Sequence, residues 1–312
     1  MRVSSPRRRH LLSGVALLLV CGCGGVTAVE TGGAAGTVEA AGTVVPVVAS
    51  TNVYGDIVER IGGDRVRVDS IISDPAQDPH SYEASSRTQL ALSKAKVIVE
   101  NGGGYDDFVD RMRAAARNTS AEVVDVVEVS GKDPDADEDF NEHLWYDFPT
   151  MGRLADRIAG ALAEAAPEDA DAFRRNAGAF KDELTSLQRD TARIEADHAG
   201  AAVAVTEPVP LYLTEACGLR NSTPADFSQA VEEGEEVSPR SLRTTLALFT
   251  DRKVEALVYN EQTSGPQTEK VRQAAEDNAI PVVPVTETLP EGEDYIGWMS
   301  ATIDSLGNAL DR

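Results

Sequence analysis

The stretch Glu168–His198, with the sequence EDADAFRRNAGAFKDELTSLQRDTARIEADH, decides the fold predicted for this chain. Its apolar side chains recur at spacings of three, four and seven residues, the pattern of one face of an α-helix; they are Phe173, Ala177, Phe180, Leu184, Leu187 and Ile194. A helix of about 30 residues is much longer than the average helix of a globular domain. We therefore predict a rigid strut that joins two lobes.

Short apolar runs alternate with helical stretches on both sides of this strut. Before it, strands are predicted at residues 44–49, 66–72, 97–100 and 122–127, with helices at 53–61, 87–95 and 106–116. After it, strands are predicted at 202–206, 254–259 and 282–285, with helices at 210–216, 268–277 and 295–310. This alternation is typical of parallel βαβ units, so we expect an α/β protein with two parallel sheets. Because ligands of such folds bind at the carboxyl ends of strands, a cleft between the lobes is predicted.

The expected division is an N-terminal lobe over residues 44–149, a helical connector over 150–198 and a C-terminal lobe over 199–312. The connector is predicted to open with a helix over Met151–Ala166 that Thr150 caps. Pro167 interrupts it, since proline lacks the N–H that a continuing helix needs.

Residues 1–23 are typical of a secretory signal, because arginines precede an apolar run of about 10 residues that is too short to span a bilayer. Gly22 before Cys23 fits a bacterial lipoprotein signal, so we expect lipidation at Cys23; a plain cleaved signal is the alternative. Arg8-Arg9 weakly resembles a twin-arginine signal, which leaves the export route open. Residues 24–43, mostly Gly, Ala, Thr and Val, predict a flexible tether.

The charge balance excludes some classes of protein. The chain has 52 acidic and 29 basic residues and a net charge of −23, the opposite of what a nucleic-acid binder needs. Three cysteines are too few for a disulfide-stapled mini-protein. The internal Cys217 is expected to be a small buried hydrophobic residue.

The residues that can carry chemistry lie in loops after predicted strands. The sequence has no H-E-x-x-H, G-x-S-x-G or phosphate-binding P-loop motif, and Gly102–Gly104 lacks dinucleotide-binding spacing and predicts a turn. Four segments remain, and each places potential ligands near a strand end: Asp78–Glu83, Glu142–Asp147, Thr206–Pro208 and Thr286–Thr288.

Two of these segments resemble a known family. Asp78-Pro79-His80-Ser81-Tyr82-Glu83 and His143-Leu144-Trp145 occur in the order found in the TroA-like (cluster A-I) metal-binding proteins of bacterial zinc and manganese ABC importers. The likeness extends from Val44 to the C-terminus and includes the strut. It implies a two-lobed receptor that binds a metal ion between its lobes.

The resemblance also implies the ligands. His80 and His143 match the two family histidines, Glu207 matches a position that is histidine in many zinc members and glutamate in many manganese members, and Glu287 stands where the family usually has aspartate. Glu261 is a rival fourth ligand, or a residue that orients a histidine. Without the resemblance, each of these side chains could be an ordinary solvated, capping or packed residue.

The ligand set leaves the metal open. Nitrogen and oxygen ligands exclude a thiolate-type copper site. Four closed ligands suit tetrahedral Zn²⁺, whereas bidentate carboxylates favour Mn²⁺ or Fe²⁺. The acidic loop at residues 133–139, just before His143, is expected to be a solvated charge run, with weak capture of cations as the alternative.

The predicted function is therefore that of a lipoprotein at the outer face of the cytoplasmic membrane. We expect a monomer without catalytic activity that takes up Zn²⁺ or Mn²⁺ as cargo and delivers it to an ABC permease and its ATPase. The alternatives are an adhesin or scaffold with a structural metal and a surface metallo-hydrolase.

Overall fold

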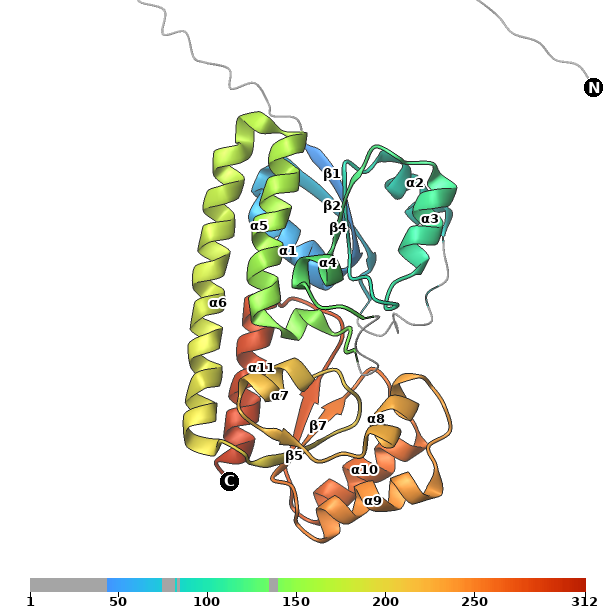
Figure 1. The fold of residues 1–312 in the computed structure, drawn as a ribbon, viewed down its shortest axis with the longest axis vertical. Coiled ribbons are helices and arrows are strands. Elements are labelled where there is room, and N and C mark those ends of the chain that lie inside the picture. Colours follow the sequence, from blue (N-terminus) through green and yellow to red (C-terminus); the bar gives the residue numbers. More distant parts are fainter. Residues whose placement is uncertain (1–43, 75–81, 83–84, 135–139) are drawn as a thin grey trace, which may run out of the picture. The chain divides into compact units, whose positions relative to one another are not determined.

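Two four-stranded parallel sheets organise the computed structural model, which describes residues 44–74, 82, 85–134 and 140–312 (Figure 1). The first sheet has the order β2-β1-β3-β4, and its strands are β1 (Val45–Thr51), β2 (Val66–Ile72), β3 (Val97–Glu100) and β4 (Glu122–Asp125). The second has the order β6-β5-β7-β8, with β5 (Ala202–Val205), β6 (Arg220–Asn221), β7 (Ala256–Asn260) and β8 (Val282–Val285). The predicted α/β fold class is confirmed.

Helices cover both sheets. Those that follow the strands of the first sheet are α1 (Asn52–Gly62), α2 (Ser86–Lys94), α3 (Phe108–Ala116) and α4 (Val126–Ser130). The second sheet carries α7 (Leu211–Ala216), α8 (Ala225–Glu232), α9 (Pro239–Thr250), α10 (Pro266–Asp277) and α11 (Tyr295–Leu310). Every residue of β3, β5 and β7 is buried, as expected of parallel strands with both faces covered.

The strut is present as α6 (Ala170–His198). All six apolar positions predicted for its inner face are buried, and Thr191 joins them. The helix packs on α1 and on α5 (Phe148–Ala165) beside the first sheet, and on α7 and α11 beside the second. One rigid element therefore contacts the helices of both sheets, as Figure 1 shows.

The first helix of the connector begins earlier than the predicted Met151. Helix α5 starts at Phe148 with Asp147 as its cap residue, so the expected cap at Thr150 is wrong. Pro149 explains the shift, because proline is well suited to the first turn of a helix. Thr150 Oγ1 instead donates to Asp147 Oδ2 at 2.5 Å. Pro167 interrupts the connector as predicted, in a 3-10 turn over Pro167–Asp169.

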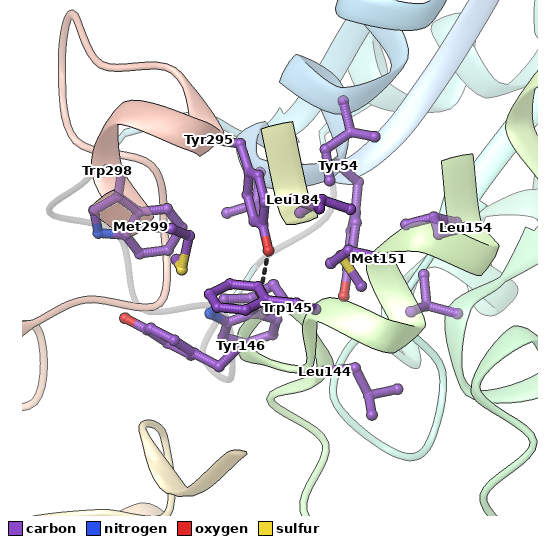
Figure 2. Packing of buried hydrophobic residues seen from close by; sticks show 14 of the residues in the cluster. Tyr54, Leu144, Trp145, Tyr146, Met151, Leu154, Leu184, Tyr295, Trp298 and Met299 are labelled. Carbon is purple, nitrogen blue, oxygen red and sulfur yellow. Dashed lines mark hydrogen bonds between the residues drawn. The ribbon is translucent and has the colours of Figure 1, made fainter. Parts of the chain in front are cut away.

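The loop after β8 is fastened to the N-terminal half of the chain. Tyr295 Oη donates to the carbonyl of Trp145 at 2.6 Å within the aromatic cluster of Figure 2. Tyr146 Oη donates to the carbonyl of Thr286 at 2.9 Å. Asn52, the first residue of α1, donates to the carbonyl of Leu289 and accepts its N–H, at 2.8 and 2.9 Å. These bonds hold both sides of the loop segment that contains Glu287.

Some elements were not predicted. The segment between α7 and β7 contains β6, α8 and α9, and the expected strand over 122–127 ends at Asp125, where α4 begins. Cys217 is buried as predicted, and burial raises the pKa of its thiol to about 12. Within the described ranges, no helix combines the length and the apolarity needed to cross a membrane.

Candidate metal centre

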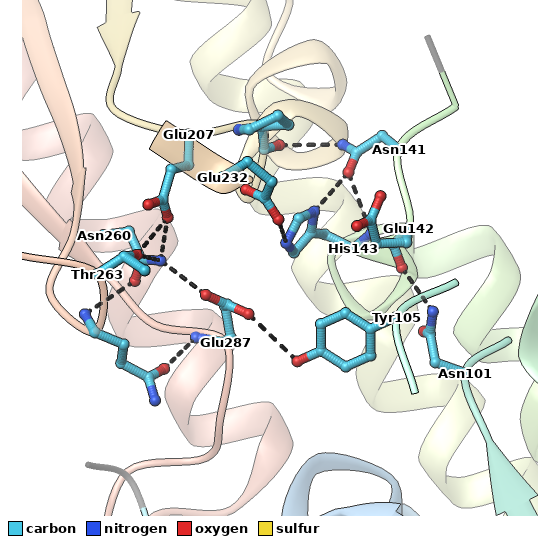
Figure 3. A network of polar contacts seen from close by, with 12 residues as sticks. Asn101, Tyr105, Asn141, Glu142, His143, Glu207, Glu232, Asn260, Thr263 and Glu287 are labelled. Atoms are coloured by element: carbon cyan, nitrogen blue, oxygen red, sulfur yellow. Dashed lines mark hydrogen bonds and ion pairs between the residues drawn. The ribbon is translucent and has the colours of Figure 1, made fainter. Parts of the chain in front are cut away.

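Two buried carboxylates lie at the carboxyl edge of the second sheet. Glu207 follows β5 and Glu287 follows β8, and their residues are only 1% and 2% exposed. Asn260 ends β7, the strand between them, and its Nδ2 donates to Glu207 Oε2 and, at 2.9 Å, to Glu287 Oε1 (Figure 3). One amide group therefore holds both predicted carboxylate ligands.

The loop after β7 supplies the other fixed contacts. Thr263 Oγ1 donates to Glu207 Oε2 at 2.6 Å. Gln262 Oε1 accepts the backbone N–H groups of Glu287 and Thr288 at 2.5 and 3.0 Å. These neutral side chains set the position of both acidic residues without neutralising them.

The imidazole of His143 is fully buried and has a fixed orientation. Asn141 Nδ2 donates to the carbonyl of Pro208 at 3.1 Å, so the amide oxygen must face His143. That oxygen accepts the backbone N–H of His143 at 3.1 Å and lies 2.7 Å from its Nδ1. A neutral ring therefore carries its proton on Nδ1 and presents the lone pair of Nε2 as a ligand.

A third carboxylate, which we did not predict, faces this nitrogen. Glu232 is the last residue of α8, and its Oε1 lies 3.2 Å from His143 Nε2. The Glu232 side chain is 12% exposed. Figure 3 shows Glu232 and Glu287 on the side of the imidazole opposite Asn141.

The first sheet contributes Tyr105. It follows the turn at Gly102–Gly104, where all three glycines have positive φ and a Cβ on Gly102 would lie 2.6 Å from the Asp125 carboxylate. The predicted turn is thus confirmed. Tyr105 Oη donates to Glu287 Oε2 at 3.4 Å, and its ring centroid lies 5.0 Å from that of Trp145. The aromatic rings form an apolar wall beside His143.

The cluster is electrostatically suited to a cation. Burial disfavours a charged imidazole, but the carboxylates of Glu232 and Glu287 outweigh it and raise the pKa of His143 to about 9. Burial raises the pKa of Glu207 to about 8, and the same two carboxylates add to this shift against the hydrogen bonds that Glu207 accepts. Among the described residues, Glu207 Oε1 is a buried oxygen without a hydrogen-bond partner. A divalent cation would provide both the charge and the missing contact.

The structure brings three of the four predicted ligands into this network, namely His143, Glu207 and Glu287. The fourth, His80, lies outside the described residues, as does Cys23. No three His, Cys, Asp or Glu side chains of the described ranges are close enough together to hold a metal ion in this conformation.

Glu261 lies elsewhere. Its residue is exposed and lines a surface cavity with Trp298 and Pro290. Its neighbour Asn260 contacts both carboxylates, and Gln262 bonds the backbone of Glu287. Asn260 and Gln262 thus hold the two glutamates, whereas the Nδ1 side of the His143 ring, which Glu261 was expected to orient, faces Asn141. The acidic loop is outside the described residues from 135 to 139.

A family model described as "Zinc-uptake complex component A periplasmic" (ZnuA) matches residues 47–309. The chain belongs to the ZnuA family. This confirms the resemblance found through the motifs around His80 and His143. The description of this family names a periplasmic component of a zinc-uptake complex.

Relatives and solved structures agree with this membership. The "Manganese ABC transporter substrate-binding lipoprotein PsaA" of Streptococcus mitis is 24% identical over 294 residues, which cover 88% of this chain and 91% of the relative. A ZnuA crystal structure has a TM-score of 0.71 at 23% identity and covers 86% of this chain and 99% of its own. The periplasmic zinc-binding protein TroA from Treponema pallidum has a TM-score of 0.68 at 21% identity, with coverages of 86% and 100%. These two structures share the fold.

Proposed function

We propose that this chain is the extracytoplasmic receptor of an ABC importer for a divalent transition metal, Mn²⁺ or Zn²⁺. The observation that carries the proposal is the buried pair Glu207 and Glu287, which a neutral amide holds together beside the oriented imidazole of His143. Carboxylate oxygens and imidazole nitrogen are ligands that suit both metals. The name of the manganese-transporter relative supports the same function.

His143, Glu207 and Glu287 would bind the cargo directly, and we propose His80 as the ligand from the N-terminal lobe, residues 44–149. The connector, 150–198, would keep this lobe and the C-terminal lobe, 199–312, in position around the ion. The aromatic wall of Tyr105 and Trp145 limits access of water to the imidazole. The receptor would then pass the ion to a permease driven by its ATPase, with no bond-making step of its own.

Metal analysis and thermal unfolding test this function. The purified chain is stripped with a chelator and titrated with MnCl₂ or ZnSO₄. At a metal concentration of about 100 times the Kd, binding adds about 2.7 kcal/mol to the free energy of unfolding. For a domain of this size the Tm then rises by about 5–10 °C. The proposal fails if neither metal raises the Tm.

Two variants control this experiment. His143→Ala should lose the rise, whereas Glu261→Gln, which neutralises an exposed carboxylate outside the network, should keep it. A deletion strain separates the alternatives, because a receptor requires a metal-uptake defect, whereas an adhesin with a structural metal predicts normal uptake.

We also propose that the chain is lipidated at Cys23 and is held at the outer face of the cytoplasmic membrane through the tether at residues 24–43. Metabolic labelling with an alkyne fatty acid should label the native chain and leave Cys23→Ala unlabelled and in the soluble fraction. Equal labelling of the two would exclude this anchor.

A further inference from the structure

We propose that Glu232 is an additional ligand of the transported ion and that it biases the site towards a metal of higher coordination number than tetrahedral Zn²⁺. This inference rests on the proposed function, since it assigns a residue to the same site. It adds a third carboxylate to Glu207 and Glu287.

The position of Glu232 beside the imidazole of His143 favours a role as a metal ligand. Its carboxylate touches His143 at Nε2, the ring nitrogen left for the metal once Nδ1 is committed to Asn141. A residue that only oriented the ring would be expected at the other nitrogen, as Asn141 is. Glu232 therefore lies on the side of the imidazole where the ion must bind.

The distance between Glu232 Oε1 and His143 Nε2 also suits two ligand atoms of one ion. Transition metals bind nitrogen and oxygen ligands at about 2.0–2.2 Å, so two ligand atoms on one ion lie about 2.9–3.5 Å apart. Glu232 Oε1 and His143 Nε2 are separated by 3.2 Å. One ion can contact both atoms with little change in their separation.

The negative charge around Glu232 favours a bound cation. Glu232 is the last residue of α8, and the carboxyl end of a helix carries partial negative charge that disfavours an acidic side chain. The side chain is also turned towards a region that already holds Glu207 and Glu287 (Figure 3). A cation among the three carboxylates would remove both unfavourable interactions.

A third carboxylate changes which metal ion the site prefers. His143, Glu207, Glu232 and Glu287 would fill the four positions of a tetrahedral ion with one atom each, so a single bidentate carboxylate already exceeds that number. Mn²⁺ readily takes such oxygen-rich, higher coordination, whereas zinc sites built from protein ligands alone are almost always four-coordinate. Removal of Glu232 should therefore weaken Mn²⁺ binding more than Zn²⁺ binding.

The test compares Glu232→Gln with Glu233→Gln, which neutralises the exposed carboxylate of the next residue. Dissociation constants for MnCl₂ and ZnSO₄ are measured on the purified chain by competition with a metal indicator. We expect Glu232→Gln to weaken Mn²⁺ binding about ten- to a hundredfold, the loss seen when metal sites lose a supporting group. Zn²⁺ binding should fall less, and Glu233→Gln should match the native chain.

Mn K-edge X-ray absorption of the loaded native chain provides a readout that does not depend on a variant folding. It should count five or more oxygen and nitrogen neighbours, and one fewer in Glu232→Gln. Native-like Mn²⁺ affinity in Glu232→Gln, or tighter binding, would overturn the inference, since Glu232 would then only pair with His143 or compete with the ion. Failure of the native chain to bind either metal would instead refute the proposed function.

Discussion

Replacing Glu207 by Gln should make the metal-free protein more stable while removing its response to metal. The Glu207 carboxylate is buried beside two other carboxylates, and its Oε1 has no hydrogen-bond partner among the described residues. Gln has nearly the same shape, and its amide oxygen can still accept from Asn260 and Thr263. The substitution thus removes a buried charge and keeps the main contacts.

The magnitude follows from the pKa of Glu207, which burial and the nearby carboxylates raise from 4.5 to about 8. Because the folded chain binds this proton more tightly than the unfolded chain, stability falls as the pH rises from about 4.5 and levels off above about 8. At pH 7 the loss is about 3 kcal/mol. Gln should recover about 2 kcal/mol of it, since its new N–H groups also need partners, and raise the Tm by about 4–8 °C.

Thermal unfolding in a chelator, followed from about pH 5 to about pH 8, checks this reasoning. The difference between Glu207→Gln and the native chain should be small at the acidic end and should grow with pH. Added Mn²⁺ or Zn²⁺ should raise the Tm of the native chain much more than that of the variant. A variant less stable than the native chain at pH 7, or a difference independent of pH, would refute the reasoning.

Three further substitutions test the parts that support the site. Asn141→Ala removes the acceptor that orients His143 and should weaken Mn²⁺ and Zn²⁺ binding about ten- to a hundredfold with little loss of helix content, as measured by calorimetry and circular dichroism. Asn52→Ala removes both hydrogen bonds to the backbone of Leu289. It should lower the free energy of unfolding by about 1–3 kcal/mol and speed amide hydrogen exchange at Leu289. Unchanged exchange would contradict the proposed anchoring. Leu184→Ala on the buried face of the strut should lower the free energy of unfolding by about 2–5 kcal/mol in denaturant titration and leave the metal Kd unchanged.

The bounds of a helix or strand could be predicted where its apolar residues form the pattern typical of that element. Strands β2, β3 and β8 and helix α11 have the bounds that their apolar patterns predicted. β3 is wholly buried and α11 buries one face, whereas the edge strands β2 and β8 are only partly buried. In all four, the apolar residues follow the pattern typical of the element. By contrast, β6 has only two residues and α8 buries only Phe227 and Ser228, so neither presents a repeated apolar pattern.

The site could be predicted only in part. The end of a strand shows which region of the chain lies at the site, but it does not show which residue of that region points into it. Glu207 and Glu287 each lie two residues past the end of a strand and are buried in the network, as expected of the carboxyl edge of a parallel sheet. Glu261 was chosen as a rival ligand by its chemistry, yet Asn260, one residue earlier, is the side chain that reaches the carboxylates. Successive side chains of an extended segment point to opposite sides, so an error of one residue selects the wrong face.

Glu232 shows why the remaining ligand could not be found this way. In the sequence it is one of four glutamates within the five residues 232–236, a pattern typical of a solvated surface. Only the end of α8 and the packing of its loop bring it to His143, 89 residues earlier in the chain. Buried apolar residues make the strut and the sheets recognisable in the sequence. An acidic side chain at the carboxyl end of a helix is unfavourable unless a cation is bound beside it, so its position follows no general sequence rule. The acidic run therefore hides Glu232 in the sequence, and only the folded structure shows its contact with His143.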